Sequence, residues 1–342
     1  MPTRFPDTIA TTARSLAIGL GGAGVAWGLS VPAAFLIGPA VAVTLASVAG
    51  LRMGMADWLR DICMVTLGLG IGAGFTAQAS AAILRWPLAF AVLAVTLTVS
   101  LLISRTVLQR GFGFDRRSAV LAAVPGHLSL VLGIAAGSGL DVGRIALVQT
   151  IRLLLLSVVV PFAALALGYR MQANVMPGGA AMAWDVLAGL AVVGVALALV
   201  LRRLGLPAPM LLGPLIVSAI GHVGGISPGA LPGWIMAAAF LGLGVLIGAR
   251  FSGMSAGLVR GALLAGLTTT GIAVGMTALA AVPVAYALNM PVAHVLAAFS
   301  PGGLETMIAL GAAMGASPGF IAASHVIRLL ILSLLLPVFL RK

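Results

Sequence analysis

The chain has 342 residues, of which 61% are hydrophobic and only 8% charged, and its formal net charge is +12. A soluble domain carries about a quarter charged residues, so this composition excludes a soluble protein and predicts a polytopic membrane protein. Of the 19 basic residues 18 are arginines, which stand singly or in small groups between apolar runs. That distribution is typical of loop anchors in membrane proteins and not of a nucleic-acid interface. The one cysteine, Cys63, excludes an internal disulfide and a cysteine-based metal site.

The first half of the chain contains apolar runs of bilayer length, each followed by a turn or a charged connection. We interpret the first run as an uncleaved transmembrane helix and not as a secretory signal, because equivalent sequence recurs later in the chain. A basic connection over 105–117 follows the fourth run, and Arg144 opens a long span that ends near Leu167. The expected segments are 13–30, 33–50, 62–83, 87–104, an interrupted piece at 118–137, and 144–167.

The second half repeats this plan. A polar, glycine-containing stretch at 169–182 predicts a linker between a first membrane repeat, 1–168, and a second, 183–342. The glycines at 68–74 and at 242–248 are expected to be helix-packing surfaces, because small residues let membrane helices approach closely. The expected segments are 184–201, 208–222, 232–249, 259–285, a broken piece at 291–314, and 318–340.

The two halves align residue for residue near their ends. Pro125-Gly126 matches Pro301-Gly302, and Arg152 matches Arg328, both at an offset of 176 residues. Further upstream, Leu36-Ile37-Gly38-Pro39 matches Leu211-Leu212-Gly213-Pro214 at an offset of 175. The agreement covers most of the chain and therefore indicates an internal duplication.

The loop charges favour an inverted duplication. When the arginine-rich loops of both halves are placed in the cytoplasm, corresponding loops fall on opposite sides of the bilayer. Inversion requires an odd number of crossings in each half, so we expect five transmembrane helices plus one re-entrant or discontinuous helix per repeat. Both termini then lie in the cytoplasm, at a bacterial-type inner membrane. The favoured form of the non-crossing segment is a re-entrant helical hairpin. The competing arrangements are twelve crossings with parallel halves, or a broken membrane-spanning helix in place of each hairpin.

The interrupted pieces are the expected substrate site. A Pro-Gly break inside an apolar helix exposes backbone groups that lipid cannot satisfy, so it persists only where it is buried or lines a water-filled cavity. Paired breaks at matching positions mark the central site of many transporters, although a tolerated proline kink is the alternative. The candidate residues at the breaks are Pro125, Gly126, Ser129, Ser300, Pro301, Gly302 and Gly303.

Two arginines stand deep inside the apolar sequence that follows the breaks. Arg152 lies roughly 12 Å along a helix from Arg144, and Arg328 roughly 17 Å from Ser317, in a hydrocarbon core about 30 Å thick. Gln149 and His325 each precede an arginine by three residues and share its helix face. A pair of guanidiniums suits a carboxylate or a similar oxyanion. The structural alternative is that Arg328 pairs with Glu305 and Arg152 with backbone carbonyls.

Glu305, the one glutamate, and two histidines are candidates for ion coupling. An isolated carboxylate in lipid becomes neutral and carries a proton, whereas beside Arg328 it stays ionised. The sequence leaves both roles open for Glu305. His127 at the first break and His325 are the other candidate coupling residues. The four histidines lack metal-ligand spacing, so we expect no metal and no cofactor.

The motifs Pro125-Gly126-His127-Leu128-Ser129 and Ser300 to Glu305, each followed by an arginine, resemble the AbrB-type integral membrane protein family. The resemblance implies two copies of a membrane duplication unit over nearly the whole chain, and a kinship with inverted-repeat antiporters and anion transporters. Family members carry labels such as ammonia monooxygenase or regulator of AidB expression. A copper monooxygenase needs a cluster of imidazoles, and a DNA-binding regulator needs a soluble reading element; this sequence has neither.

We therefore expect a secondary transporter with alternating access for a small organic anion, coupled to protons or sodium, and not an enzyme. The alternative is a membrane sensor that binds a ligand without moving it and affects gene expression indirectly. The expected partners are the anionic substrate, its coupling ion and the lipid bilayer, with no direct contact to nucleic acid. A homodimer is a further possibility.

Overall fold

The computed structural model describes residues 5–75, 86–125, 128–169 and 181–340, and within these ranges the chain is helical and forms no strand. The helices of the first half are α1 (Phe5–Gly28), α2 (Ala34–Val48), α3 (Asp57–Gly72), α5 (Trp86–Phe112), α6 (Arg116–Ala123), α7 (Leu128–Gly137) and α8 (Val142–Ala166). Those of the second half are α9 (Trp184–Arg203), α10 (Pro209–Val223), α11 (Gly233–Ala249), α12 (Ala256–Leu288), α13 (Val292–Phe299), α14 (Leu304–Ala313) and α15 (Pro318–Leu340).

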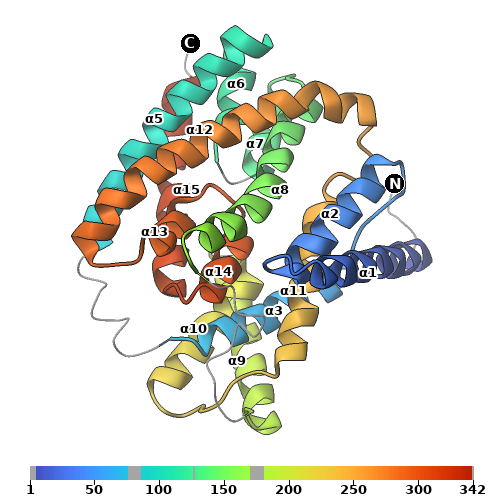
Figure 1. The fold of residues 1–342 in the computed structure, drawn as a ribbon, viewed down its shortest axis with the longest axis vertical. Coiled ribbons are helices and arrows are strands. Elements are labelled where there is room, and N and C mark those ends of the chain that lie inside the picture. Colours follow the sequence, from blue (N-terminus) through green and yellow to red (C-terminus); the bar gives the residue numbers. More distant parts are fainter. Residues whose placement is uncertain (1–4, 76–85, 126–127, 170–180, 341–342) are drawn as a thin grey trace. The chain divides into compact units, whose positions relative to one another are not determined.

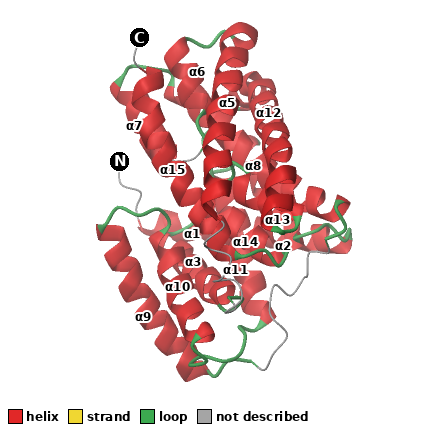
Figure 2. Cartoon of the chain, turned by 90° about the vertical axis from the view of Figure 1, so that its left-hand side faces the viewer, coloured by secondary structure: helices red, strands yellow, loops and turns green. Residues whose placement is uncertain are grey.

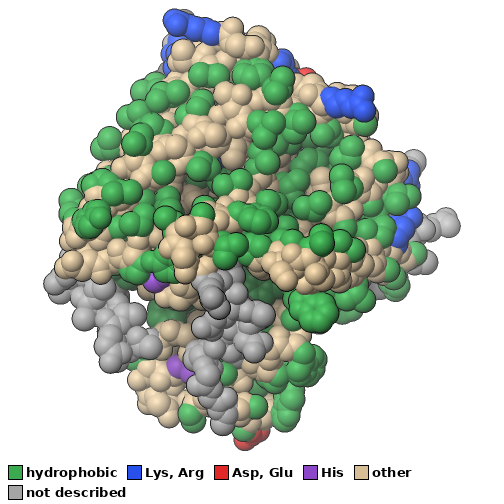
Figure 3. All heavy atoms as spheres, in the orientation of Figure 1, with side chains coloured by type: hydrophobic (Ala, Val, Ile, Leu, Met, Phe, Trp, Pro, Cys, Tyr) green, Lys and Arg blue, Asp and Glu red, His purple; other side chains and the backbone are tan. Residues whose placement is uncertain are grey.

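The helices have the length and composition of a membrane protein. Five of those described, α5, α8, α9, α12 and α15, are long and apolar enough to cross a bilayer, and α2, α10, α11 and α14 are shorter apolar helices. The face drawn in Figure 3 is made mostly of hydrophobic side chains and uncharged atoms. Large apolar side chains that a soluble protein would bury are exposed, among them Trp27 at 70% and Trp184 at 64%. Such a surface is suited to lipid.

Most expected segments coincide with helices, and two boundaries were wrong. The connection at 105–117 is largely helical, because α5 continues to Phe112 and carries Arg105 and Arg110 in its last two turns. Long arginine side chains extend toward water from the end of a helix, so they do not require a loop. The expected segment 62–83 also differs, because α3 begins at Asp57 and ends at Gly72, and residues 76–83 lie outside the described part of the chain. The expected linker 169–182 lies almost entirely outside the described residues.

The chain forms two compact units, and each contains segments from both sequence halves. Unit 1 comprises Met1–Ile83, Pro161–Gly253 and Ile308–Pro318, and unit 2 comprises Leu84–Val160, Met254–Met307 and Gly319–Lys342. Helices α1, α2 and α3 of the first half therefore belong to the same unit as α9, α10 and α11 of the second. Corresponding helices are consequently assembled together, as duplicated sequences allow.

Glycines allow the helices of unit 1 to pack closely. A Cβ atom added to Gly22 of α1 would lie 2.5 Å from the carbonyl oxygen of Gly38 in α2. Added to Gly248 of α11, it would lie 2.8 Å from the carbonyl oxygen of Ala40, also in α2. Gly72 of α3 approaches the Leu215 carbonyl of α10 in the same way, at 2.6 Å. The expectation that these glycine runs are packing surfaces is thus confirmed.

The duplicated sequence also repeats its backbone conformation. α2 packs against α11 and α10 packs against α3, so both of these contacts join the first half of the chain to the second. α2 and α10 both begin after an alanine in the left-handed region, Ala33 with φ 50° and Ala208 with φ 47°. A non-glycine residue with positive φ is uncommon. Its recurrence at an offset of 175 residues is independent support for the duplication.

Unit 2 is built around the two longest helices. α5 and α12 pack against one another (Figures 1 and 2), and the colours of Figure 1 show that they run in opposite directions. α6 and α13 are short helices that pack against α5 and α12 respectively. Each ends before a proline, at Val124 with φ −58° and ψ 123° and at Ser300 with φ −58° and ψ 129°. A proline disfavours the helical region for the residue before it, which explains why both helices stop where they do.

Candidate binding site at the helix breaks

Arg152 fastens the first break to α8. Its Nη1 and Nη2 donate hydrogen bonds to the carbonyl oxygens of Ala123 and Val124, at 3.1 and 3.0 Å. These two residues end α6, so their carbonyls belong to the last turn, where a helix has no N–H partner to offer. The arginine is only 2% exposed. A buried guanidinium therefore satisfies the carbonyls that the proline break leaves free.

Arg328 does the same for the second break. It is also 2% exposed, and its Nη1 and Nη2 donate to the carbonyl oxygens of Ser300 and Gly302, at 2.8 and 3.2 Å. Val124 and Ser300 occupy matching positions in the two halves, so the duplication extends to the hydrogen bonds of the site. The expected alternative for Arg152, pairing with backbone carbonyls, is what the structure has, and it holds for Arg328 too.

The positive charge at the breaks has no carboxylate partner in the described part of the chain. Glu305, in the first turn of α14, is partly exposed and forms no ion pair with Arg328. The two arginines are close enough for their like charges to interact. The Nε atoms of both are buried without a hydrogen-bond partner. Two interacting cations with unused donors form a region that attracts an acceptor or an anion.

A small cavity of about 20 Å³ lies between the two breaks and the long helices α5 and α12. It is lined by Arg152, by Pro125 and Pro301 from the two breaks, and by hydroxyl-bearing residues of α5 and α12. A cavity of this size holds about one water molecule, so the described conformation is nearly closed. The hydroxyl-bearing lining residues are Thr96, Ser100 and Ser104 of α5 and Thr269 and Thr277 of α12.

The residues three positions before the arginines differ in their contacts. Gln149 donates from Nε2 to the Leu121 carbonyl of α6 at 2.6 Å, which adds a third bond between α8 and the first break. His325 instead uses Nδ1 toward the Ile321 carbonyl of its own helix at 3.0 Å, and its Nε2 is buried without a partner. Ser324 beside it also has a buried hydroxyl without a partner. The second half thus keeps unused polar groups where the first half has a hydrogen bond.

Several predicted site residues are brought together, and some are not described. Pro125, Ser300, Pro301 and Gly302 are buried at the breaks, and Gly303 lies near Leu153 of α8. Gly126 and His127 lie outside the described residues, and Ser129 lies in α7 with a side chain that is not described. Sequence reasoning missed the α5 and α12 hydroxyls. Isolated serines and threonines in apolar helices give little signal, because they bond to the carbonyl four residues back, as Thr96 does at 2.8 Å.

Comparison with known proteins gives a family and two named relatives. The family model described as "Transition state regulatory protein AbrB" matches residues 35–342. The chain is 29% identical over 262 residues to "Uncharacterized protein YhjN" of Bacillus subtilis (strain 168), covering 70% of this chain and 67% of that protein. It is 26% identical over 318 residues to "Putative regulator AbrB" of Escherichia coli (strain K12), covering 87% of this chain and 86% of that protein.

Proposed function

The chain belongs to the AbrB family, and from that premise we propose that it is a secondary membrane transporter for a small organic anion. The substrate binds where the two breaks, α5 and α12 meet, in unit 2. Arg152 and Arg328 supply the positive potential, and the α5 and α12 hydroxyls supply neutral hydrogen bonds. Glu305, His127 and His325 are the proposed coupling residues, with protons or sodium as the coupling ion.

The observation that carries this proposal is the matched pair of buried arginines. Each donates to two carbonyls at the end of a short, proline-terminated helix, and the two residues are equivalent in the duplication. Interrupted helices at corresponding positions of two repeats are the arrangement that transporters use to build a central site.

The polarity of the site favours an anion over a cation or a neutral ligand. The buried groups without a partner include the Nε–H donors of Arg152 and Arg328, which only an acceptor can satisfy. Transfer of a carboxylate to this point gains attraction to both guanidiniums in a medium of low dielectric constant. A metal cation there would be repelled by the same two charges.

Alternating access follows if the two repeats are inverted. In unit 2, the matched helices α5 and α12 run in opposite directions, as expected for an in-plane two-fold relation (Figure 1). We infer five crossings per repeat, with α6–α7 and α13–α14 as the segments that do not cross, at a bacterial-type inner membrane with both termini in the cytoplasm. A nearly closed cavity of about 20 Å³ is consistent with an occluded conformation that opens to admit substrate.

The second candidate function is a membrane sensor that binds the same class of anion without moving it. The relative named as a regulator favours it, because a ligand-bound membrane protein can influence gene expression indirectly. Both functions need the same site, so only movement of the ligand separates them.

The experiment begins with a thermal-stabilisation screen of the purified protein against acetate, lactate, succinate and related anions, since a specific ligand raises stability by mass action. The best ligand is then used for uptake into proteoliposomes. Ser100→Ala removes one cavity hydroxyl and should weaken apparent affinity several-fold, as loss of one hydrogen bond of about 1 kcal/mol implies.

Thr98→Ala is the matched control, since Thr98 lies on the same helix, bonds to the Ala94 carbonyl at 2.8 Å and does not line the cavity. Equal effects of the two substitutions, or no stabilising anion in the screen, would count against the site.

A further inference from the structure

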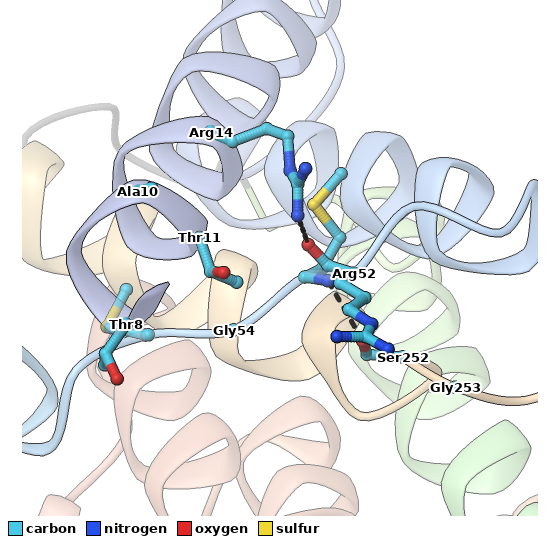
Figure 4. Close-up of a pocket in the computed structure, with 10 residues that line it drawn as sticks. Thr8, Ala10, Thr11, Arg14, Arg52, Gly54, Ser252 and Gly253 are labelled. Atoms are coloured by element: carbon cyan, nitrogen blue, oxygen red, sulfur yellow. Dashed lines mark hydrogen bonds between the residues drawn. The ribbon is translucent and has the colours of Figure 1, made fainter. Parts of the chain in front are cut away.

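Unit 1 contains a second and much larger pocket, of about 740 Å³, that shares no residue with the cavity at the breaks. It lies between the N-terminal part of α1, the segment joining α2 to α3, and the turn after α11 (Figure 4). Its polar lining comprises Thr8, Thr11, Arg14, Arg52 and Ser252, and the backbone of Gly54 and Gly253 also borders it. Its volume is that of a small-molecule site.

Hydrogen bonds to α1 hold the wall of this pocket in place. The N–H groups of Gly54 and Ala56 donate to the hydroxyls of Ser15 and Thr12, both at 2.9 Å. Arg14 reaches across from α1 and donates through Nη2 to the carbonyl oxygen of Arg52 (Figure 4). The segment between α2 and α3 is thus fixed by three side chains of one helix. A wall fixed in advance lowers the entropy lost when a ligand binds.

The turn after α11 forms another side of the pocket and is hydrogen-bonded to the segment between α2 and α3. The N–H of Met53 donates to the Ser252 hydroxyl at 2.9 Å, and Met53 itself is buried against Val43 and Val245. The residues on either side of Met53 therefore have defined positions although they border an open pocket. The pocket is consequently a formed feature of unit 1.

The charge of the pocket is one-sided. Arg14 and Arg52 are both exposed at its edge, and none of its described lining residues carries a carboxylate. The Arg52 guanidinium has no hydrogen-bond or ion-pair partner in the described part of the chain. By contrast Arg60, a few residues further on, is paired with Asp57 and Asp61 at 2.8 and 3.0 Å. Carboxylates therefore neutralise Arg60, whereas Arg14 and Arg52 at the pocket have no carboxylate partner among the described residues.

We propose that this pocket binds a phosphate group. A guanidinium forms two parallel hydrogen bonds to a phosphate, and Arg14 and Arg52 line the pocket together with the hydroxyl-bearing residues Thr8, Thr11 and Ser252. The phosphate belongs either to the headgroup of an anionic phospholipid or to a soluble phosphate compound. Occupation would tie α1 to the turn after α11, so ligand binding stabilises unit 1. This role is independent of the proposed transport.

Binding is measured on the purified full chain in a neutral detergent, as the shift of the thermal unfolding midpoint. The probes are inorganic phosphate, glycerol phosphate, a short-chain phosphatidylglycerol and, for comparison, a short-chain phosphatidylcholine. The expected result is a saturable rise in midpoint with the phosphatidylglycerol or with the soluble phosphates. The rise with the zwitterionic lipid should be smaller, because its choline cation is repelled by the two arginines. A response to the lipid alone identifies a headgroup, and a response to soluble phosphates alone identifies a soluble ligand.

Arg52→Gln is the decisive variant, because the Arg52 guanidinium forms no hydrogen bond or ion pair with the described residues and its loss should leave the fold intact. Losing one charged contact is expected to weaken the apparent affinity roughly tenfold or more. Arg60→Gln, a neighbouring and already paired arginine, is the matched control and should bind as the unaltered protein does. The proposal is overturned if no phosphate probe stabilises the chain, or if Arg52→Gln and Arg60→Gln behave alike.

Discussion

Replacing the arginines at the breaks tests both their hydrogen bonds and their mutual repulsion. In Arg152→Gln the carbonyls of Ala123 and Val124 lose bonds of 3.1 and 3.0 Å. Both carbonyl-bearing residues are buried, and glutamine is too short to reproduce the fork. At least one buried carbonyl is left unpaired, which costs about 1–3 kcal/mol.

Two effects reduce this cost. Removing a buried cation relieves its desolvation, and it also relieves the repulsion that Arg152 exerts on Arg328. The lost bonds themselves are also weak, since hydrogen bonds between membrane helices contribute only about 0.6 kcal/mol on average. We therefore expect Arg152→Gln to lower the free energy of unfolding by about 1–2 kcal/mol. Arg328→Gln should have a similar effect, since it too donates to two carbonyls.

The double variant separates the two effects. Each single substitution includes a gain from relieved repulsion, and this gain is available only once. The double variant is therefore expected to be destabilised by more than the sum of the single variants. The assay is reversible unfolding in detergent, analysed as a double-mutant cycle, with the exposed Arg110→Gln as control. Strict additivity would refute the claim that the two charges interact, and a stabilised single variant would refute the role of its carbonyl bonds.

Other consequences concern packing and capping. Gly22→Ala should destabilise unit 1 by about 1–3 kcal/mol, because its Cβ would lie 2.5 Å from the Gly38 carbonyl oxygen. Gly21→Ala, whose added Cβ would lie more than 4 Å from the described residues outside α1, should be neutral or slightly stabilising when unfolding in detergent is measured for both variants. Asp115 caps α6 by accepting a hydrogen bond from the Ser118 N–H at 3.0 Å, so Asp115→Ala should cost about 0.5–2 kcal/mol at neutral pH. Partial burial raises the pKa of Asp115, but hydrogen bonds from Ser118 and Arg117 outweigh it and hold the pKa below 3.8. Because the folded pKa is lowered, the difference from unaltered protein should persist above pH 4 and vanish as the pH falls through the folded pKa.

The sequence was most informative where covalent constraints act locally. Prolines at matching positions predicted the two breaks, and the structure has them, because Val124 and Ser300 must leave the helical region before a proline. The glycine runs predicted close packing for a similarly local reason, because a residue without a side chain lets a neighbouring helix approach its backbone. Arg105 and Arg110 were placed in a loop by their charge, which does not by itself end a helix.

The partners of the site could not be derived in the same way. The sequence offered Glu305 as the structural partner of Arg328, whereas the structure gives Arg328 the carbonyls of Ser300 and Gly302. That outcome depends on how α15 packs against the end of α13. The cavity-lining residues of α5 and α12 were not identified, because their roles come from the packing of two helices about 170 positions apart in sequence. Long-range packing of this kind leaves no local pattern.

The most direct measurement of the proposed function is counterflow in proteoliposomes. Vesicles preloaded with the anion that stabilises the purified protein are diluted into a trace of the labelled anion. A transporter should accumulate label transiently above its equilibrium level, and this accumulation should be smaller in Ser100→Ala but unchanged in Thr98→Ala. Saturable binding of the same anion with no accumulation of label in any vesicle preparation would contradict transport and leave a binding protein in its place.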